Sequence, residues 1–460
     1  MKIKNKIFNI VVVLVDILLI NLGFYIAFMM KFDFNPPRYN IGPYIEIIPF
    51  ITIAALLYFD LYGLLKPLKK SLYETVYSIV LAIMLLCITT IAITYINQGF
   101  SFPRSILLVS PVLQIALLVL WRMFAWEIRK YILDTRNVIV IGTQDDDLDS
   151  IVGKIKAPAS NMLLNIKNTC DIADIENVFR LINNNNDVFI SSSVPDETKK
   201  RIIGYCMNNG KGIYIMPDMS EILLYKAQML QFDDIATFEV EQLKLSIVQK
   251  MIKRLFDIVF STIALIIFSP VLLISAIAIK LNSKGPVFYS QERVTRGGRE
   301  FDVYKFRTMV NNAEEITGPT LSAENDDRIT SVGNFLRKTR IDELPQFLNV
   351  LKGDMSVVGP RPERPHFVEQ FKKEIPGYEY RTHVKAGITG LAQVLGKYST
   401  EPEDKLRYDL LYIRNYSILY DIKIILQTLN IVLMRHGAEG LKAIDEGSLA
   451  RTEGKKLIDV

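Results

Sequence analysis

The segment that decides the fold is Leu255-Phe-Asp-Ile-Val-Phe-Ser-Thr-Ile-Ala-Leu-Ile-Ile-Phe-Ser269-Pro270-Val-Leu-Leu-Ile-Ser-Ala-Ile-Ala-Ile279, which is apolar and long enough to enter a lipid bilayer. Basic residues flank it on both sides: Lys244, Lys250, Lys253 and Arg254 before it, and Lys280, Lys284, Arg293, Arg296 and Arg299 after it. Lysine and arginine gather on the cytoplasmic side of membrane proteins, so both ends are expected in the cytoplasm. A single straight span does not meet that expectation.

Ser269-Pro270 explains how both ends could stay on one side. Pro270 lacks the N–H that would bond the carbonyl of Ile266, and its ring crowds that carbonyl, so the helix bends or breaks there. At 1.5 Å per residue the two arms would be roughly 22 and 15 Å long, shorter than the ~30 Å hydrocarbon core. We expect a re-entrant hairpin over 255–279, in which the Ser269 hydroxyl bonds backbone freed by the proline. The alternative is a fifth span with a kink.

The whole chain has the composition of a membrane protein with soluble parts. It has 460 residues, 50% of them hydrophobic, and a mean hydropathy of +0.22. These values exclude an ordinary soluble enzyme and a disordered or fibrous chain. Three cysteines are too few for a disulfide framework, and three histidines without ligand-like spacing do not indicate a zinc site. We expect a reducing, cytosolic setting for the soluble parts.

Four further apolar runs, each long enough to span a bilayer, occupy residues 7–30, 44–64, 72–96 and 105–126. Basic residues at both ends of this region place its ends in the cytoplasm, which predicts a four-helix transmembrane bundle over 1–135. A signal peptide is the weaker alternative for the first run, which lacks a small-x-small cleavage site. Asp16 lies near mid-membrane; it is either functional or, as we expect, satisfied by a neighbouring helix such as the one with Thr89 and Thr90.

Residues 136–240 have the pattern of a small α/β domain. Apolar runs predict strands, and helical patterns lie between them; the strands are 137–143, 187–191 and 211–217, and the helices are 174–184 and 195–209. The arrangement is Rossmann-like, with its first strand ending at Gly142. A dinucleotide site would continue as Gly-x-Gly-x-x-Gly, whereas Thr143-Gln-Asp-Asp-Asp147 carries carboxylates that would repel a pyrophosphate. We expect a structural or oligomerising role without a bound nucleotide.

The segment Gln291–Met309 follows the predicted hairpin and is basic, with five Lys or Arg residues against three acidic ones. Its position next to a membrane segment indicates that it binds anions. Acidic lipids would satisfy such a cluster as well as a phosphate substrate, and this segment alone does not decide between them.

Asp342 and Glu343 lie in the segment Arg337-Lys-Thr-Arg-Ile-Asp-Glu-Leu-Pro-Gln-Phe-Leu-Asn-Val-Leu-Lys-Gly353. Pro345 suits the opening turn of a helix and Gly353 a stop, so both carboxylates fall at the N-terminal end of that helix. Free N–H groups there can receive phosphate oxygens, and a divalent cation would offset the repulsion between phosphate and carboxylate. Adjacent helical residues point about 100° apart, so one carboxylate can attack while the other holds metal or a proton. The alternative is that Asp342 caps the helix and Glu343 is a first-turn acid.

Arg361 has a proline on each side in Gly359-Pro-Arg-Pro362. The prolines fix the backbone and lower the entropy cost of holding the arginine side chain. A guanidinium presented in this way suits bidentate phosphate recognition. It could equally be a structural ion-pair partner.

Eight motifs resemble, in this order, those of the bacterial sugar transferase family of monotopic phosphoglycosyl transferases. They are Lys253-Arg-Leu-Phe-Asp257, Ser269-Pro270, Lys305-Phe-Arg-Thr-Met309, Ile341-Asp-Glu-Leu-Pro-Gln346, Leu351-Lys-Gly-Asp-Met-Ser356, Gly359-Pro-Arg-Pro362, Gly387-Ile-Thr-Gly390, and Asn415-Tyr-Ser417 with Asp421. With the upstream bundle and α/β domain, the chain resembles the long form of that family, the polyprenyl glycosylphosphotransferases that start exopolysaccharide, capsule or O-antigen repeat units.

The resemblance implies a reaction in which a UDP-sugar gives its sugar 1-phosphate to polyprenyl (undecaprenyl) phosphate and releases UMP, with Mg²⁺ and a covalent aspartyl phosphosugar. Asp342 would be the nucleophile and Glu343 its partner, both also metal ligands. The other residues carried over are Arg337 and Arg361 for substrate phosphate, and Asp421, Lys305 and Arg307 as supporting residues. The resemblance further implies a multi-pass protein of the bacterial inner membrane, contacts with membrane lipids, a homodimer, and no nucleic-acid partner.

The expected fold class is a membrane α-helical bundle plus an α/β Rossmann-like domain plus a mixed α/β catalytic domain anchored by a re-entrant membrane helix. The expected boundaries are 1–135 for the bundle, 136–240 for the Rossmann-like domain, 241–254 for a linker, 255–279 for the hairpin, 280–440 for the cytoplasmic catalytic domain and 441–460 for a tail. Two alternatives stay open: a non-catalytic membrane scaffold for glycan-assembly enzymes, and direct attack by polyprenyl phosphate in a ternary complex.

Overall fold

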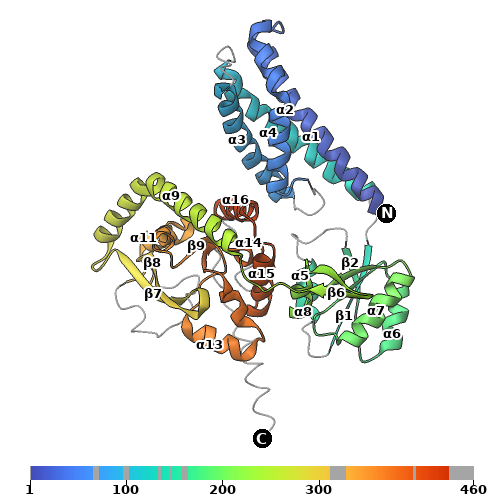
Figure 1. The fold of residues 1–460 in the computed structure, drawn as a ribbon. Coiled ribbons are helices and arrows are strands. Elements are labelled where there is room, and N and C mark those ends of the chain that lie inside the picture. Colours follow the sequence, from blue (N-terminus) through green and yellow to red (C-terminus); the bar gives the residue numbers. More distant parts are fainter. Residues whose placement is uncertain are drawn as a thin grey trace. The chain divides into compact units, whose positions relative to one another are not determined.

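The computed structural model describes residues 2–65, 72–96, 103–132, 136–143, 148–156, 164–310, 328–396 and 400–434. The chain divides into two compact units, Met1–Pro217 and Asp218–Val460, which are described separately (Figure 1). The predicted tail at 441–460 and the acidic residues Asp145, Asp146 and Asp147 lie outside the described residues.

The first unit begins with four long apolar helices, as predicted: α1 Lys2–Lys31, α2 Arg38–Leu61, α3 Leu72–Ile96 and α4 Arg104–Ile132. Each contains a segment long and apolar enough to cross a membrane, and a fifth helix of the described residues, in the second unit, meets the same criterion. Figure 1 shows these four helices packed lengthwise against one another. The chain is therefore a membrane protein.

Asp16 has a different partner from the one expected. Arg122 on α4 donates from Nη2 to Asp16 Oδ2 at 2.5 Å and from Nε to Asp16 Oδ1 at 3.2 Å. Arg122 also bonds the carbonyl of Leu64 at 3.0 Å. The hydroxyls of Thr89 and Thr90 instead bond carbonyls of their own helix four residues earlier. The expectation that a neighbouring helix satisfies Asp16 is confirmed, but the suggested threonine partner is wrong, because a buried carboxylate is better compensated by a guanidinium than by a hydroxyl that already bonds its own backbone.

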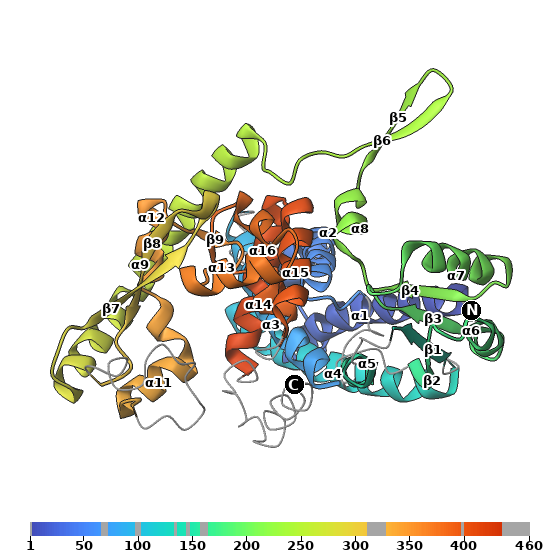
Figure 2. The same cartoon turned by 90° about the horizontal axis from the view of Figure 1, so that it is seen from below.

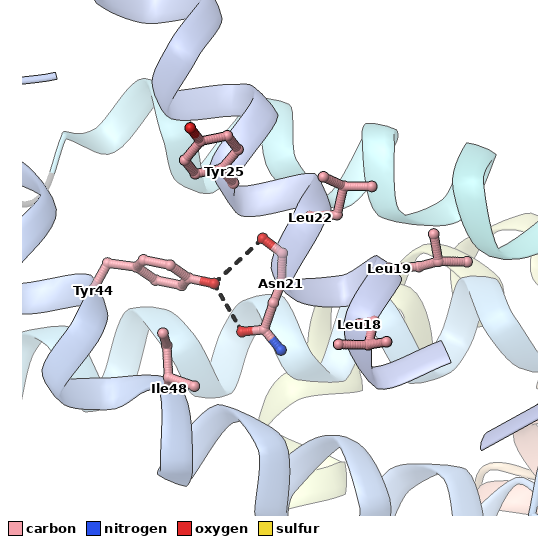
Figure 3. Close-up of a pocket in the computed structure, with 7 residues that line it drawn as sticks. All are labelled: Leu18, Leu19, Asn21, Leu22, Tyr25, Tyr44 and Ile48. Carbon is pink, nitrogen blue, oxygen red and sulfur yellow. Dashed lines mark hydrogen bonds between the residues drawn. The ribbon is translucent and has the colours of Figure 1, made fainter. Parts of the chain in front are cut away.

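A shallow, mostly apolar hollow lies between α1 and α2. Figure 3 shows Tyr44 of α2 reaching across to Asn21 of α1. The Tyr44 hydroxyl donates to Asn21 Oδ1 at 2.8 Å. The remaining lining residues are Leu18, Leu19, Leu22, Tyr25 and Ile48. The same hydroxyl also lies 3.4 Å from the carbonyl oxygen of Asn21, so Tyr44 joins the two helices through polar contacts within a mostly apolar hollow.

The first unit continues with a parallel sheet in the order β2-β1-β3-β4. Its elements are β1 Arg136–Gly142, α5 Leu148–Lys156, β2 Leu164–Asp171, α6 Ile175–Asn183, β3 Asp187–Ile190, α7 Asp196–Asn208 and β4 Gly212–Ile215. The three predicted strands and both predicted helices are confirmed. The sequence missed β2, because this edge strand is mostly polar and exposed. A Rossmann-like assignment stays a prediction.

The second unit starts earlier than the predicted boundary at residue 240. Ile222 of α8 (Met219–Leu224) is buried in its hydrophobic core together with Leu243 and Leu245. The segment therefore belongs to the second unit, and the boundary moves to Pro217. Between these anchors the chain forms a hairpin of β5 Gln228–Phe232 and β6 Ile235–Glu239.

Helix α9 runs without interruption from Ile247 to Asn282 and changes direction along its length (Figure 1). Of the two outcomes predicted at Pro270, a bend or a break, the break is absent, because 255–279 lies within one continuous helix; the re-entrant course stays a prediction. The Ser269 hydroxyl donates to the carbonyl of Ile266 at 2.8 Å, as predicted. This bond replaces the one that Pro270 cannot make, and it lets the helix continue through the proline.

The rest of the second unit packs around buried apolar residues such as Val350, Met355, Val358 and Leu410. An antiparallel pair and a short parallel pair of strands are surrounded by helices (Figure 2). The strands are β7 Phe288–Val294, β8 Glu300–Phe306, β9 Ser356–Val358 and β10 Gly387–Thr389. The helices are α11 Ser331–Thr339, α12 Gln346–Lys352, α13 Pro365–Glu374, α14 Leu391–Leu395, α15 Pro402–Arg414 and α16 Ile418–Met434.

Candidate active site

The first part of α9 carries charged side chains that bond the soluble part of the second unit. Lys253 Nζ donates to Asp421 Oδ2 on α16 at 2.6 Å, and the hydroxyl of Tyr412 donates to Asp421 Oδ1 at 2.8 Å. The Lys253 and Asp421 side chains are 7% and 0% exposed. Asp421, predicted as a supporting residue, thus joins α16 to the base of α9, and neither of these bonds is to Asp342 or Glu343.

Two further bonds from α9 reach the segments that carry the site. Arg254 donates to the carbonyls of Val350 and Leu351 at 2.6 and 2.7 Å, which satisfies the C-terminal end of α12. Asp257 Oδ1 accepts from the backbone N–H of Val357 at 3.0 Å. The Lys253–Asp257 motif therefore fixes the membrane helix to the framework of the site.

Asp342 and Glu343, hereafter the dyad, lie in a 3₁₀ turn, Ile341–Glu343, between α11 and α12. The turn starts after Arg340, whose φ of +60° lies in the left-handed region and reverses the chain. Pro345 is the N-cap of α12 and Gly353 its C-cap. The expected helix with the dyad at its N-terminal end is present, but the carboxylates precede the first α-helical residue instead of belonging to it.

Glu343 is surrounded by cations. Its Oε1 lies 3.0 Å from Lys305 Nζ and 3.5 Å from Arg361 Nη2, and its Oε2 lies 3.9 Å from Arg340 Nη1. Burial opposes ionisation of this carboxyl, yet the charges of Lys305, Arg361 and Arg340 hold the pKa of Glu343 below its usual range. Glu343 is therefore an ionised, firmly positioned carboxylate.

Asp342 has the opposite environment. The residue is 8% exposed, and its Oδ1 is buried without a hydrogen-bond partner among the described residues. Burial, followed by the negative charge of Glu343, raises the pKa of Asp342 to about 6, although Lys305, Arg340 and Arg337 oppose the shift. An oxygen that the described residues leave without a partner can bond a ligand or a reacting atom.

The remaining predicted residues divide into two groups. Lys305 and Arg361 contact Glu343 of the dyad directly. The charge of Arg337 acts on Asp342, and Arg337 Nε donates to Thr308 Oγ1 at 2.8 Å. Arg307 instead bonds Ser283, donating from Nη2 to the carbonyl at 2.8 Å, and so holds the residue after α9. Arg340 was missed, although a basic residue two positions before the dyad was a visible signal.

The backbone that presents Arg361 is held tightly. Its carbonyl accepts from Arg381 Nη2 at 3.0 Å, and Arg381 is paired with buried Asp409 at 2.8 Å. A Cβ on Gly359 would lie 2.3 Å from the carbonyl oxygen of Lys385, so no side chain fits there. The Gly359–Pro362 motif is thus a packed support that fixes where the guanidinium of Arg361 lies.

The two carboxylates of the dyad indicate which metal ion this site could bind. The described residues contain no group of three or more His, Cys, Asp or Glu that could hold an ion. Magnesium is commonly held by one or two carboxylates together with substrate phosphates and water. The oxygen of Asp342 that no described residue bonds, next to the ionised Glu343, fits that mode of binding.

A family model and the similar proteins of known sequence indicate the same family for this chain. The model of the family described as bacterial sugar transferase matches residues 248–435. A UDP-N-acetylgalactosamine-undecaprenyl-phosphate N-acetylgalactosaminephosphotransferase of Aeromonas hydrophila is 42% identical over 52% of this chain and 56% of that protein. A UDP-glucose:undecaprenyl-phosphate glucose-1-phosphate transferase of Escherichia coli (strain K12) is 38% identical over 53% of each.

The chain spans about half the length of these two curated relatives. A sugar transferase of Haemophilus influenzae, named as uncharacterized, is 33% identical over a longer region, 66% of this chain and 70% of that protein. The family match includes α9, the dyad and the residues around it. The chain belongs to the bacterial sugar transferase family.

Proposed function

We propose that this protein transfers a sugar 1-phosphate from a UDP-sugar to undecaprenyl phosphate and releases UMP, through a covalent phosphosugar on Asp342. The observation that carries the proposal is the contrast within the dyad. Asp342 has a buried oxygen with no partner among the described residues, while three cations hold the neighbouring Glu343 ionised. The names of similar proteins support the choice of substrates.

The proposed reaction has two displacements at one phosphorus atom. In the first, a carboxylate oxygen of Asp342 attacks the phosphorus that carries the sugar; a P–O bond to Asp342 forms, the P–O bond to UMP breaks, and UMP leaves with the electron pair. In the second, a phosphate oxygen of undecaprenyl phosphate attacks the same phosphorus and releases the Asp342 carboxylate. A carboxylate nucleophile lets two bulky substrates use one site in turn.

Positioning and charge neutralisation are the main requirements of phosphoryl transfer. Arg361, whose side chain is 42% exposed, can bond a substrate phosphate while its backbone stays fixed. Lys305 and Arg340 keep Glu343 in place beside Asp342. Mg²⁺, held by the dyad, would supply the positive charge that offsets repulsion between the diphosphate and the two carboxylates.

The same proposal gives α9 a role in substrate access. Residues on both sides of Pro270 expose large apolar side chains, with Ile266 at 67% and Ile274 at 66%. We propose that this part of α9 is embedded in the cytoplasmic leaflet of the inner membrane and returns to the same side. The dyad would then meet a soluble UDP-sugar and a lipid phosphate at the cytoplasmic face.

The test is a nucleotide-sugar panel with the purified full-length protein, Mg²⁺ and undecaprenyl phosphate, scored by UMP release. One UDP-sugar should release UMP, and mass spectrometry should locate a phosphosugar on Asp342 when the lipid acceptor is omitted. Asp342→Asn should lose UMP release, whereas Glu369→Gln, which alters an exposed carboxylate on α13 paired with Lys372, should keep it.

Three outcomes would contradict the proposal. Wild-type turnover in Asp342→Asn would exclude Asp342 as the nucleophile. UMP release that strictly requires the lipid acceptor, without an adduct, would indicate direct attack in a ternary complex. Lipid binding with no UMP from any nucleotide sugar would favour a non-catalytic scaffold.

A further inference from the structure

Arg307 is a buried arginine whose charge the described residues do not match. The residue is 6% exposed, and its Nη2 donates to the carbonyl and to the hydroxyl of Ser283 at 2.8 and 2.7 Å. Both of these acceptors are neutral. Nε and Nη1 of Arg307 are buried and have no hydrogen-bond partner among the described residues. A buried cation is costly unless it is paired and hydrogen-bonded, so this guanidinium indicates an anionic ligand.

Two other arginines among the described residues are equally buried, and both have a carboxylate partner. Arg122 is 5% exposed and pairs with Asp16, and Arg381 is 7% exposed and pairs with Asp409. The burial of these two arginines is thus accompanied by a negative charge from the chain, and Arg307 departs from that pattern. The comparison favours a bound molecule as the source of the missing negative charge.

Arg307 lies where the long apolar helix α9 meets the soluble part of the second unit. Ser283, which it bonds, is the C-cap of α9. Ile279 of α9 packs in a buried apolar cluster with Phe306, the residue before Arg307. Leu281, near this end of α9, is 83% exposed. An anion at Arg307 therefore lies next to an apolar helix surface, and a phosphate that carries a long hydrocarbon chain matches both features.

The same junction adjoins the dyad. Thr308, the residue after Arg307, accepts from Arg337 Nε at 2.8 Å, and the charge of Arg337 acts on Asp342. Ile341, the residue before Asp342, packs against the apolar cluster that joins α9 to β8 and α11. These elements lie side by side in Figure 1. Arg307 is therefore held by the same packed elements as the nucleophile, on the side of the dyad that α9 supplies.

Arg307 and Arg361 differ in exposure as the two substrates of the proposed reaction would require. The Arg361 side chain is 42% exposed and lies 3.5 Å from Glu343, so a nucleotide sugar in solution can reach it. Arg307 is 6% exposed and bonds the residue that ends α9. A lipid phosphate that approaches along α9 would meet Arg307 first. The two guanidiniums are thus suited to two different phosphates.

We propose that Arg307 binds the phosphate of the polyprenyl phosphate acceptor and holds it for the second displacement. This inference rests on the proposed function. In that step an unprotonated oxygen of the acceptor phosphate forms a bond to the phosphorus on Asp342, the P–O bond to Asp342 breaks, and the carboxylate leaves with the electron pair. Arg307 offsets the repulsion between the acceptor phosphate and the phosphosugar, and it takes no part in the first displacement.

The test measures the two displacements separately in the purified full-length protein with Mg²⁺ and the UDP-sugar that releases UMP. Without acceptor, Arg307→Gln should form the Asp342 adduct and release UMP at a rate within about two-fold of the parent rate. When undecaprenyl phosphate is added, the adduct should discharge about 10- to 100-fold more slowly, which is the loss expected for one hydrogen bond to a charged group. Arg307→Lys keeps the charge and should recover part of the discharge rate.

Ser283→Ala is the matched control. It removes the hydroxyl that accepts from Arg307 at 2.7 Å but keeps the guanidinium. If Arg307 served only to hold Ser283, this variant would reproduce the slow discharge, whereas the proposal expects a rate close to that of the parent. The proposal is overturned if Ser283→Ala and Arg307→Gln discharge equally slowly. It is also overturned if Arg307→Gln and Arg307→Lys slow adduct formation as much as discharge, since that would assign Arg307 to the nucleotide sugar or to folding.

A binding measurement gives a result that needs no turnover. The full-length parent protein in nanodiscs should bind a short-chain polyprenyl phosphate more tightly than the matching polyprenol, and Arg307→Gln should lose most of that difference. Equal binding of the phosphate by the parent and by Arg307→Gln would overturn the inference. A parent protein that binds the lipid phosphate but forms neither UMP nor an adduct from any UDP-sugar would instead contradict the proposed function, so the two failures are distinguishable.

Discussion

Replacing Lys253 by methionine tests whether the buried pair with Asp421 anchors the catalytic unit to α9. The two side chains are 7% and 0% exposed and their charged atoms lie 2.6 Å apart. Methionine keeps most of the side-chain volume but leaves the Asp421 carboxylate buried without its cation. Removing one partner of a buried pair costs about 3–5 kcal/mol of unfolding free energy, and at about 2–4 °C per kcal/mol the melting temperature should fall by roughly 6–20 °C.

The assay is thermal unfolding of the full-length protein in detergent, followed by far-UV circular dichroism. Both tryptophans, Trp121 and Trp126, lie on α4, so tryptophan fluorescence reports on the first unit and should change little. Lys352→Met is the control, because this lysine is exposed although it bonds the Tyr304 hydroxyl at 2.6 Å. Its replacement should change the free energy of unfolding by no more than about 0.5 kcal/mol.

A double variant separates the ion pair from lost packing. In Lys253→Met with Asp421→Asn, position 421 no longer carries a buried charge without its cation, and Tyr412 keeps an acceptor. The free energy of unfolding that the double variant loses should therefore be about 2 kcal/mol smaller than the sum of the losses in the two single variants. The reasoning is refuted if Lys253→Met has the same melting temperature as the parent protein. It is also refuted if the double variant loses the sum of the unfolding free energies that the two single variants lose.

Three other results are expected. EDTA should abolish UMP release and added Mg²⁺ should restore it, because the dyad alone repels a diphosphate; activity that survives EDTA would contradict the metal assignment. Arg361→Lys should lower UMP release about ten-fold, since lysine keeps the charge but not the planar fork, and an unchanged rate would remove Arg361 from phosphate binding. Gly359→Ala should lose about 1–3 kcal/mol of stability, because its Cβ would lie 2.3 Å from the Lys385 carbonyl oxygen. Gly153→Ala should lose no stability, because a Cβ added at Gly153 would have no atom within 4 Å. Equal melting temperatures for the two variants would refute this steric argument.

The sequence by itself determined the features that depend on local pattern. Runs of apolar residues define the membrane helices, since a bilayer demands a minimum length of continuous apolar helix. The bond from Ser269 to the Ile266 carbonyl followed from the one hydrogen bond that Pro270 cannot make. The bounds of α12, which follows the dyad, were predicted from Pro345 and Gly353, residues whose backbone preferences act within one helix.

Only the tertiary structure decided which side chains meet. Asp16 pairs with Arg122, 106 positions later, and Lys253 with Asp421, 168 positions later. The sequence shows that a buried charge needs a partner but not which distant residue supplies it, because that choice depends on how whole helices pack. The unequal environments of Asp342 and Glu343 arise in the same way, from burial and from cations that β8 and the Arg361 loop bring to one side of the turn.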